Sequence, residues 1–520
     1  MTDNTYLLGI DFGTESVRAA IFDLAGRPVS FAATAYRTTH PHPGWAEQDP
    51  EEWWEALQAS CHKVIAASGV SPAAIKGISY DATTMTVVAM DKRGEALRPA
   101  IMWMDVRATE QAGRAEKSDS VARLYNGRGT APATAEWYPF KAAWLRENER
   151  DTYDAAFRLV DAPDWVTYKL TGEWTTNINS AALRMYYNRD HGGWPVDFYE
   201  TIGCGDVFDK IPEKVVDLGT PVGELSVIAA QLLGLHPGTP VAQGPADAWA
   251  GQIGLGVVDP GVMALITGSS HVLTGQTDKP IHGKGFFGAY TDGVVKGQYT
   301  VEGGQVSTGS VLKWFKDNFA RDLIQAAEVT GLNVYEILNK QSKDLPPGSD
   351  GLIINEYFQG NRTPYTDSKA RGVIWGLSLH HGPAHIYRAI QESVCYGTAH
   401  NLRAMSAAGF EVKKIVAAGG ATKSRDWMQM HADVTGVPIA LTEVGDAVVL
   451  GSCMLAAVGA GLHPDLGTAA KEMVHEIDLL EPDQRRHEEY RYFVDAYANT
   501  YPQLQPMIHD MVDRENTKRG

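Results

Sequence analysis

The stretch LLGIDFGTESVRAAIFD, residues 7–23, constrains the fold more than any other part of the sequence. Two apolar runs flank a short Gly-Thr-Glu-Ser connection, which predicts two strands of a hairpin joined by a tight turn. Asp11 closes the first strand and Arg18 opens the second, so a carboxylate, a guanidinium, small hydroxyls and free backbone N–H groups lie close together. A surface hairpin whose glycine only permits the turn is the alternative interpretation.

A second stretch repeats this pattern. Without a gap, IDFGTESVRAAIFD (10–23) aligns with LITGSSHVLTGQTD (265–278), and Val17 meets Val272. Self-similarity of this kind indicates two related domains, each opened by one hairpin.

The two turns differ in charge, because Asp11 of the first copy faces Ile266 of the second. Facing turns can grip both ends of a polyphosphate through backbone N–H groups and hydroxyls. Only the first turn carries a carboxylate for a metal, and magnesium suits one or two carboxylates plus water and phosphate oxygens. Arg18 would offset phosphate charge with its bidentate fork.

The length of 520 residues predicts two domains. A glycine-rich stretch ends near Asp259-Pro260, so we divide the chain into residues 1–258, residues 259–480 and a charged helical tail, 481–520. This tail is expected to pack as a terminal helix, and it could help to build a homodimer.

Composition and local sequence patterns argue against nucleic-acid binding, a signal peptide and a membrane-spanning segment. The net charge of −17 argues against a nucleic acid, whose phosphates need a basic surface. The N-terminus lacks the pattern of a signal peptide, and the longest apolar stretch, 447–462, is too short to span a membrane and predicts a buried core helix. We therefore expect a cytoplasmic protein without a membrane partner. The isolated cysteines are expected to be buried free thiols: Cys61, Cys204, Cys395 and Cys453.

A third segment, KKIVAAGGATKSRDWMQMHADVTGVPI (413–439), predicts a strand, a glycine turn and a helix. Glycines at that place let a flat ligand lie against the backbone, and Ser424 is placed to cap the helix. The chain contains no GxxxxGK[ST] motif and no GxGxxG after a strand, so P-loop and dinucleotide sites are not predicted.

With these segments in place, the chain resembles the FGGY carbohydrate kinase family, relatives of glycerol kinase, xylulokinase and ribulokinase. The matching pieces keep the family order from residue 6 to about 462: GIDFGTESVRA, GWAEQDPEEWW, WMDVRA, GPADAWA, LITGSS, EGGQVSTGSVLKWF, GNRTPYTDSKARGVIWGLSLHH and AAGGATKSRDWMQMHADVTGVPI. The resemblance implies an α/β fold of two actin-like (ribonuclease H-like) domains, each with a mixed five-stranded sheet, that close on ATP and Mg²⁺ in the cleft.

The resemblance also implies roles for individual residues. Asp247 in GPADAWA matches the catalytic aspartate, which would accept the proton of a sugar hydroxyl as its oxygen attacks the γ-phosphorus. A loop-capping aspartate is the alternative. Asp11 matches the magnesium-side carboxylate. The implied ATP-binding residues are Thr14, Glu15, Ser16, Arg18, Gly268, Ser269, Ser270, Gly309, Lys313, Gly420, Ala421 and Ser424.

The sugar is less constrained. Glycerol kinases have an Arg-Glu pair in the segment that matches SYDATTMT and a Gln after the catalytic Asp, whereas this chain lacks the pair and has Ala248 there, so glycerol is a poor candidate. Ala82 and Thr83 stand where xylulokinases have a Met-His, which makes D-xylulose doubtful as well. The ribulokinase pattern fits better, with Arg184 and Glu302 expected to bind sugar hydroxyls. Alternatively Arg184 is a surface residue and Glu302 a helix-start acid.

Trp103 and Asp105 could line the same pocket, although a tryptophan there is as often simple core. The chain departs from the family pattern around the K-x-x-W segment and at Pro245-Ala246, where many members carry polar residues. It is also shorter than ribulokinases of the arabinose pathway, and these differences put L-ribulose in doubt. A ketopentose such as ribulose is therefore the expected substrate, with a four- or five-carbon polyol open. A non-catalytic, ATP-gated binding protein is the alternative from another class, and the intact Asp247 favours the kinase.

Overall fold

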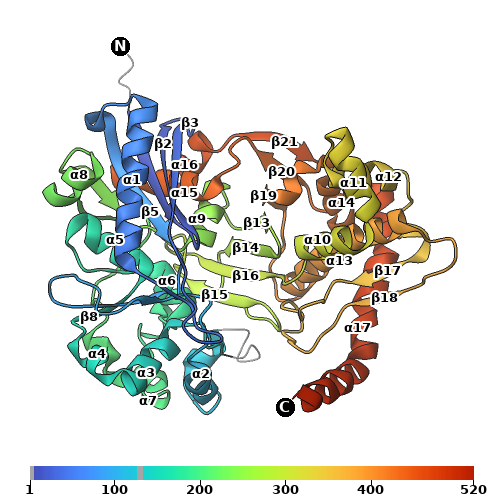
Figure 1. Cartoon of the computed structure of the whole chain (residues 1–520), viewed down its shortest axis with the longest axis horizontal. Coiled ribbons are helices and arrows are strands. Elements are labelled where there is room, and N and C mark those ends of the chain that lie inside the picture. The colour runs from blue at the N-terminus through green and yellow to red at the C-terminus, as the bar shows by residue number, and fades with distance from the viewer. Residues whose placement is uncertain (1–4, 126–132, 520) are drawn as a thin grey trace.

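The computed structural model describes residues 5–125 and 133–519, so the prediction that the N-terminus is not a signal peptide falls partly outside them. Two large mixed sheets organise the molecule, one from each half of the chain (Figure 1). The first has the strand order β11-β12-β5-β1-β2-β3, and the second β15-β16-β14-β13-β19-β20-β21. Their strands are β1 (Tyr6–Phe12), β2 (Ser16–Asp23), β3 (Pro28–Ala35), β5 (Ile75–Ala82), β11 (Pro221–Glu224), β12 (Pro240–Ala242), β13 (Val262–Thr267), β14 (His271–Thr277), β15 (Phe287–Thr291), β16 (Tyr299–Gln305), β19 (Lys414–Gly419), β20 (Ile439–Thr442) and β21 (Glu476–Leu480).

The two sheets repeat one another strand for strand. The series β3, β2, β1, β5, β12, β11 corresponds to β16, β14, β13, β19, β20, β21, with the same parallel and antiparallel pairings. This confirms the predicted duplicated α/β fold. Each sheet exceeds the expected five strands because antiparallel edge strands (β11 in one, β15 and β21 in the other) extend it.

The hairpin register corrects the ungapped alignment of the two copies. Phe12 pairs with Val17 across the first hairpin, whereas Thr267 pairs with His271 across the second. The second turn is therefore one residue shorter, and the predicted match of Val17 with Val272 is wrong by one position. Sequence identity on either side of a turn cannot reveal this, because the turn's own geometry sets the register.

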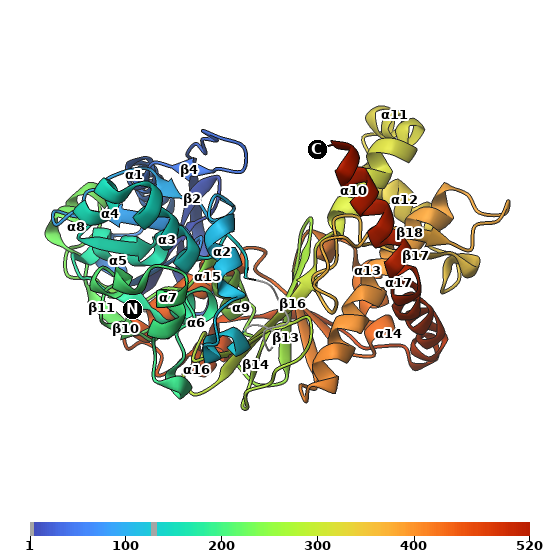
Figure 2. The same ribbon diagram turned by 90° about the horizontal axis from the view of Figure 1, so that it is seen from below.

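Helices cover both sheets. Figure 2 shows the two halves side by side, with β13, β14 and β16 of the second half's sheet on the side nearest the first half. The first sheet is covered on one side by α1 and α5, and the second is flanked by α13 and α14. The helices that matter for the site and its surroundings are α1 (Pro50–Ser68), α5 (Ala162–Thr171), α6 (Ile178–Arg184), α8 (Val227–Leu233), α9 (Asp247–Gly254), α10 (Gly309–Phe319), α13 (Pro383–Ala407), α14 (Arg425–Thr435), α15 (Ala447–Gly459) and α17 (Gln484–Arg519).

One helix crosses from the second half of the chain to the first. α15 follows β20 but packs against β1, β5 and α9. Glycines make this approach possible: a Cβ on Gly9 would lie 2.6 Å from the carbonyl oxygen of Val449, and one on Gly254 only 1.7 Å from that of Ala447. The prediction of a buried core helix here is confirmed. The division at Asp259-Pro260 stays a proposal.

The C-terminal tail is one helix, α17, that packs on α13 and α14. Tyr490, Tyr497 and Tyr501 bury its apolar face against the second half of the molecule. All four cysteines are buried free thiols, as predicted. Among the residues that the structure describes, none of the helices combines the length and the apolar character needed to cross a membrane.

Candidate active site

Three carboxylates gather where neighbouring parallel strands end. β12, β5 and β1 lie side by side and run parallel, so their carboxyl ends meet at one edge of the sheet, where ligands of such sheets bind. Asp11 in β1 lies opposite Asp81 in β5. Asp247 follows β12 as the first residue of α9, and the Ala82 N–H donates to the Pro245 carbonyl (3.3 Å), joining the last two strand ends.

Asp247 is a half-buried residue at the start of α9. Burial, and then the negative charge of Asp11, raise its pKa to about 7. Its Oδ1 accepts a hydrogen bond from the N–H of Ala248 (2.7 Å), its own neighbour. A carboxylate with such a pKa can take a proton near neutral pH.

Asp11 and Asp81 have the donor atoms that a hard cation prefers. In the part of the chain that the structure describes, Oδ1 of Asp11 and Oδ1 of Asp81 are buried without a hydrogen-bond donor. Ser452 donates to Asp81 Oδ2 (2.6 Å), while burial and the charge of Asp11 raise the Asp81 pKa. Orphaned buried carboxylate oxygens are costly, and Mg²⁺ binds this chemistry, so the residues fit the expected metal. Sequence reasoning missed Asp81, because nothing in the sequence places β5 beside β1.

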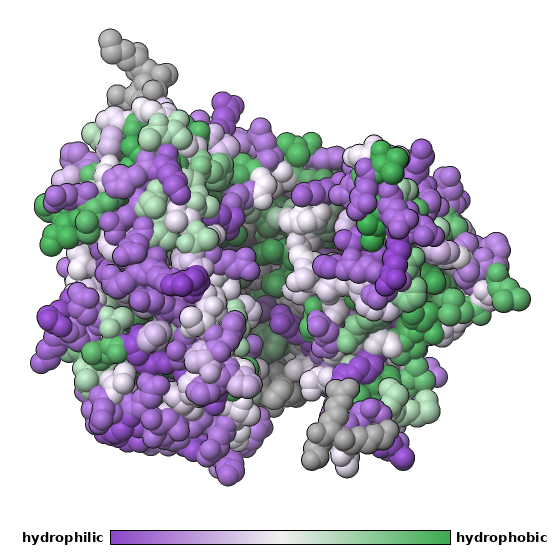
Figure 3. Space-filling model, in the orientation of Figure 1, coloured by the Kyte–Doolittle hydropathy of each residue, from purple (hydrophilic) through white to green (hydrophobic). Residues whose placement is uncertain are grey.

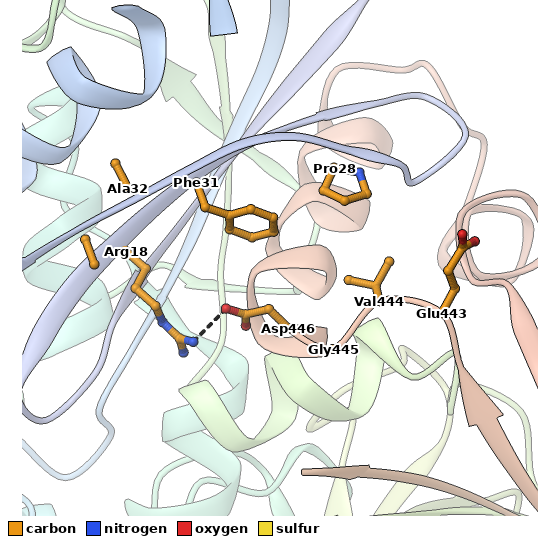
Figure 4. A pocket seen from close by; sticks show the side chains of 9 residues that line it. Arg18, Pro28, Phe31, Ala32, Glu443, Val444, Gly445 and Asp446 are labelled. Atoms are coloured by element: carbon orange, nitrogen blue, oxygen red, sulfur yellow. Dashed lines mark hydrogen bonds and ion pairs between the residues drawn. The ribbon is translucent and has the colours of Figure 1, made fainter. Parts of the chain in front are cut away.

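Arg18 lies between two carboxylates. Its Nε donates to Asp11 Oδ2 (2.6 Å), and its Nη1 donates to Asp446 Oδ2 (2.6 Å), at the start of α15. Figure 4 shows the guanidinium reaching Asp446 at one wall of an open cavity, with Phe31 beside it. Of the predicted site residues, only Arg18 lines this cavity. Sequence reasoning also missed Asp446, which is 428 residues away in the chain.

The first turn is held by its surroundings. The Gly13 N–H donates to the Ser16 carbonyl (3.0 Å), and Gln48 Nε2 donates to the Thr14 carbonyl (2.7 Å). Trp103 Nε1 donates to Thr14 Oγ1 (3.1 Å), so this half-buried tryptophan stands beside the turn. Glu15 is exposed.

The second turn lies beside the start of α10. Gly268 and Ser269 are exposed, and the Gly268 N–H donates to the Ser270 carbonyl (2.9 Å). The Thr308 N–H donates to the Ser269 carbonyl (2.9 Å). A Cβ on Gly309 would lie 2.4 Å from the carbonyl oxygen of Gly268, so this approach requires glycine.

The glycine turn after β19 lies against Thr267, the last residue of β13, next to the second turn. Gly419 has a φ of 93°, and a Cβ there would lie 2.0 Å from the carbonyl oxygen of Thr267. The Ala421 N–H donates to Thr267 Oγ1 (3.0 Å), and Gly420 is exposed. The structure thus brings together three of the predicted nucleotide segments, at residues 268–270, 309 and 420–421.

Two predicted nucleotide residues have other partners. Ser424 caps α14, as predicted, by accepting from the Trp427 N–H (3.4 Å). Lys313 is exposed and pairs with Asp317 one turn along α10.

Arg184 and Glu302 form a buried pair between the two halves of the chain. Arg184 Nη2 donates to Glu302 Oε2 (2.6 Å), and its Nη1 donates to the Tyr290 hydroxyl (2.9 Å). The guanidinium also lies 5.3 Å from the Trp249 ring, two residues after Asp247. Arg184 is therefore not a surface residue, and Glu302 lies within β16 rather than at a helix start.

Of the remaining residues predicted to bind the sugar, Ala82 and Thr83 lie beside the first turn, and Asp105 is buried in the loop that carries Trp103. The Thr83 N–H donates to the Phe12 carbonyl (3.1 Å), which places Ala82 and Thr83 beside the first turn. Asp105 is fully buried, and both of its oxygens accept hydrogen bonds, from Arg107 and from the Ala46 N–H. It orders the loop that carries Trp103 rather than facing a cavity.

Lys141 lies in the K-x-x-W segment whose flanking residues differ from the family pattern, and it joins the loop at Met85 to the loop at Met102–Trp103. Its buried Nζ donates to the carbonyls of Met85 (2.8 Å), Met102 (2.6 Å) and Trp103 (3.2 Å). Burial lowers its pKa to about 7. Asn179 connects α6 to the loop before α9, because its Oδ1 accepts a hydrogen bond from the N–H of Ala246 (3.1 Å), the residue before Asp247.

Comparisons with known proteins agree with this geometry. Residues 6–254 match the N-terminal domain, and residues 263–460 the C-terminal domain, of the FGGY family of carbohydrate kinases. An FGGY carbohydrate kinase domain-containing protein of Xenopus laevis is 31% identical over 95% of both chains. A ribulokinase of Anoxybacillus flavithermus is 31% identical over 88% of this chain and 86% of its own. The crystal structure of a xylulose kinase from Rhodospirillum rubrum superposes with a TM-score of 0.87 at 27% identity, over 97% of this chain and 100% of that one. The chain belongs to the FGGY family of carbohydrate kinases.

Proposed function

We propose that this kinase transfers the γ-phosphoryl group of ATP to a hydroxyl of a ketopentose such as ribulose, with Asp247 as the general base. The observation that carries the proposal is the placement of Asp247 among the carboxyl ends of β1, β5 and β12, with a pKa raised to about 7. An aspartate that only capped a loop would gain nothing from this pKa, whereas a base for an alcohol works best when its pKa is near the working pH.

The two turns would hold the ends of the triphosphate. Exposed Ser269 and Gly420 would offer backbone N–H groups on one side, whereas the N–H groups of Gly268 and Ala421 already donate within the protein. Residues 14–16 would offer N–H groups and hydroxyls on the other side, with Arg18 as a neighbouring cation. Phosphoryl transfer depends on position and charge stabilisation more than on covalent chemistry, so such clamps contribute a large part of the rate. Bound Mg²⁺, held by Asp11 with Asp81 beside it, would neutralise phosphate charge.

The sugar would lie between Asp247 and the Arg184–Glu302 pair. Trp249 connects them, because it lies on α9 with Asp247 and against the Arg184 guanidinium. A guanidinium and a carboxylate can donate to and accept from neighbouring hydroxyls of one sugar. A site built from buried polar groups rejects analogues that lack those hydroxyls, because the groups would be left unpaired.

The substrate is tested by measuring ADP release with Mg-ATP across ketopentoses, tetroses and polyols. We expect D- or L-ribulose to raise turnover at least tenfold above the sugar-free rate, and glycerol to leave it unchanged. If only a four- or five-carbon polyol raised turnover, the proposed substrate would be a polyol instead of a ketopentose. Release of ADP that no compound increases would overturn the proposal.

Replacing Lys141 by Met should raise the KM for the sugar about tenfold or more and change the KM for ATP little. The three carbonyls that Lys141 binds belong to the loops at Met85 and at Met102–Trp103, and they would lose their common donor. Steady-state kinetics with each substrate varied in turn measures this split.

The matched control is Lys210→Met, because Lys210 Nζ also donates to a backbone carbonyl, that of Ala156, outside the site. It should leave both KM values unchanged. A Lys141→Met enzyme with an unchanged sugar KM would show that Lys141 contributes only to stability.

A further inference from the structure

α15 carries polar side chains from the second half of the chain to the carboxylates of the first half. In Figure 3 a hollow parts the two halves on this face of the molecule, whereas α15 lies among the strands of the first half in Figure 1. A Cβ on Gly9 would lie 2.6 Å from the Val449 carbonyl oxygen, and one on Gly77 would lie 2.6 Å from that of Ala456. The helix therefore rests directly on the backbones of β1 and β5, which sets where its side chains meet these strands.

Ser452 is one of these side chains. It is fully buried, and its hydroxyl donates to Asp81 Oδ2 (2.6 Å), 371 residues earlier in the chain. A serine inside a helix can return its hydroxyl to a backbone carbonyl one turn back, so helical structure alone does not call for this contact. Ser452 thus fixes one oxygen of the Asp81 carboxyl group.

Asp446, which precedes the first residue of α15, acts on Asp11 through Arg18. The Arg18 guanidinium donates from Nη1 to Asp446 Oδ2 and from Nε to Asp11 Oδ2, each over 2.6 Å. The guanidinium is therefore held from both sides. Like Ser452 at Asp81, it occupies one oxygen of the Asp11 carboxylate and leaves the other to a different partner.

The two remaining carboxylate oxygens have no donor. Within residues 5–125 and 133–519, Oδ1 of Asp11 and Oδ1 of Asp81 are buried and accept no hydrogen bond. The two carboxyl groups are in contact across β1 and β5. Asp247 and Asp446 add negative charge at the same place. A divalent cation that prefers oxygen ligands would satisfy both oxygens.

We propose that Ser452 and Asp446 are positioning residues of the metal site, an assignment that rests on the proposed function, because Mg²⁺ neutralises phosphate charge in ATP-dependent phosphoryl transfer. Ser452 binds one oxygen of Asp81, and Asp446 does the same for Asp11 through Arg18. The other oxygen of each carboxylate is thereby left to a shared Mg²⁺. Neither positioning residue touches the metal. The metal site of the first half is thus held in shape by a helix of the second half.

The test of Ser452 measures Mn²⁺ binding without nucleotide, from the loss of the electron paramagnetic resonance signal of the free ion. Ser452→Ala should raise the Kd for Mn²⁺ about 10–100-fold, the effect of losing a partner that orients a metal ligand. Ser452→Thr keeps the hydroxyl and should restore most of the affinity. The matched control is Ser393→Ala, a fully buried serine of α13 that donates to the Ile390 carbonyl (2.8 Å), and it should leave the Kd unchanged.

The test of Asp446 uses the same titration. Asp446→Asn should raise the Kd for Mn²⁺ by less than Ser452→Ala does, because Arg18 keeps its own bond to Asp11. The control is Asp478→Asn, which breaks an exposed ion pair with Arg425 in the same half of the chain and should leave the Kd unchanged. Circular dichroism of the metal-free variants verifies that each is folded.

An unchanged Kd in Ser452→Ala would overturn the role of Ser452, and an unchanged Kd in Asp446→Asn that of Asp446. A wild-type chain that does not bind Mn²⁺ at millimolar concentration would overturn both, and the two carboxyl groups would then share a proton instead of a metal. Sugar-dependent ADP release of the wild-type chain is measured separately. Its absence would overturn the proposed function, whereas the role of Ser452 would stand if Ser452→Ala still weakened Mn²⁺ binding.

Discussion

Asp247→Asn is expected to lower sugar-dependent ADP release by about 10²–10⁴-fold, the contribution of a positioned general base. The amide keeps the size of the side chain but cannot accept the hydroxyl proton. Because the Asp247 pKa is about 7, wild-type kcat/KM should also fall about tenfold per unit of pH below 7. Steady-state ADP release from pH 5 to 9 measures both effects. The control is Asp259→Asn, an exposed aspartate at the proposed domain boundary, which should leave turnover unchanged.

The same substitution should stabilise the protein in the absence of Mg²⁺ and nucleotide. The folded pKa lies above the ordinary value of 3.8, so the folded state binds this proton more tightly than the unfolded state. That stabilisation is complete below pH 4 and is lost as the pH rises through 7. Since one pKa unit corresponds to about 1.4 kcal/mol, Asp247→Asn should raise the free energy of unfolding by a few kcal/mol at pH 8, and by less at pH 5. Urea unfolding at both values tests this, and equal gains would contradict the raised pKa.

Arg184→Met should destabilise the protein by about 3–5 kcal/mol, because it leaves the buried Glu302 carboxylate without its partner. It should also raise the sugar KM at least tenfold, since the guanidinium that would bind the sugar hydroxyls is lost. Denaturant unfolding and steady-state kinetics with sugar varied measure the two effects separately. Breaking the exposed Arg150–Asp154 pair by Arg150→Met serves as the control and should cost less than about 1 kcal/mol.

The double variant Arg184→Met/Glu302→Gln distinguishes structure from function at this pair. Removing the unpaired charge should recover most of the lost stability, because the remaining amide is neutral. The sugar KM should stay high. A double variant that recovers both stability and sugar KM would show that the pair only joins the two halves of the chain.

The sequence by itself determined the local structure, because local patterns carry that information. Alternation of apolar runs with a Gly-containing turn predicted both hairpins, and Ser424 before a helical stretch predicted a cap that the structure confirms. The duplicated fold was predicted from the similarity of residues 10–23 to residues 265–278. The roles assigned to Asp247 and to the ATP-binding residues rest on the family resemblance, and they stay proposals.

Only the tertiary structure decided which distant segments meet. A strand's apolar pattern fixes its faces but not its neighbours, and parallel strands are joined by long crossovers that hide their adjacency in the sequence. For this reason Asp81 beside Asp11, and Asp446 on Arg18, had no signal in the sequence. The pairing of Arg184 with Glu302, 118 residues apart, is of the same kind, and so is the packing of α15 on the first sheet through Gly9. Burial in that assembled site, rather than any local motif, raises the pKa of Asp247.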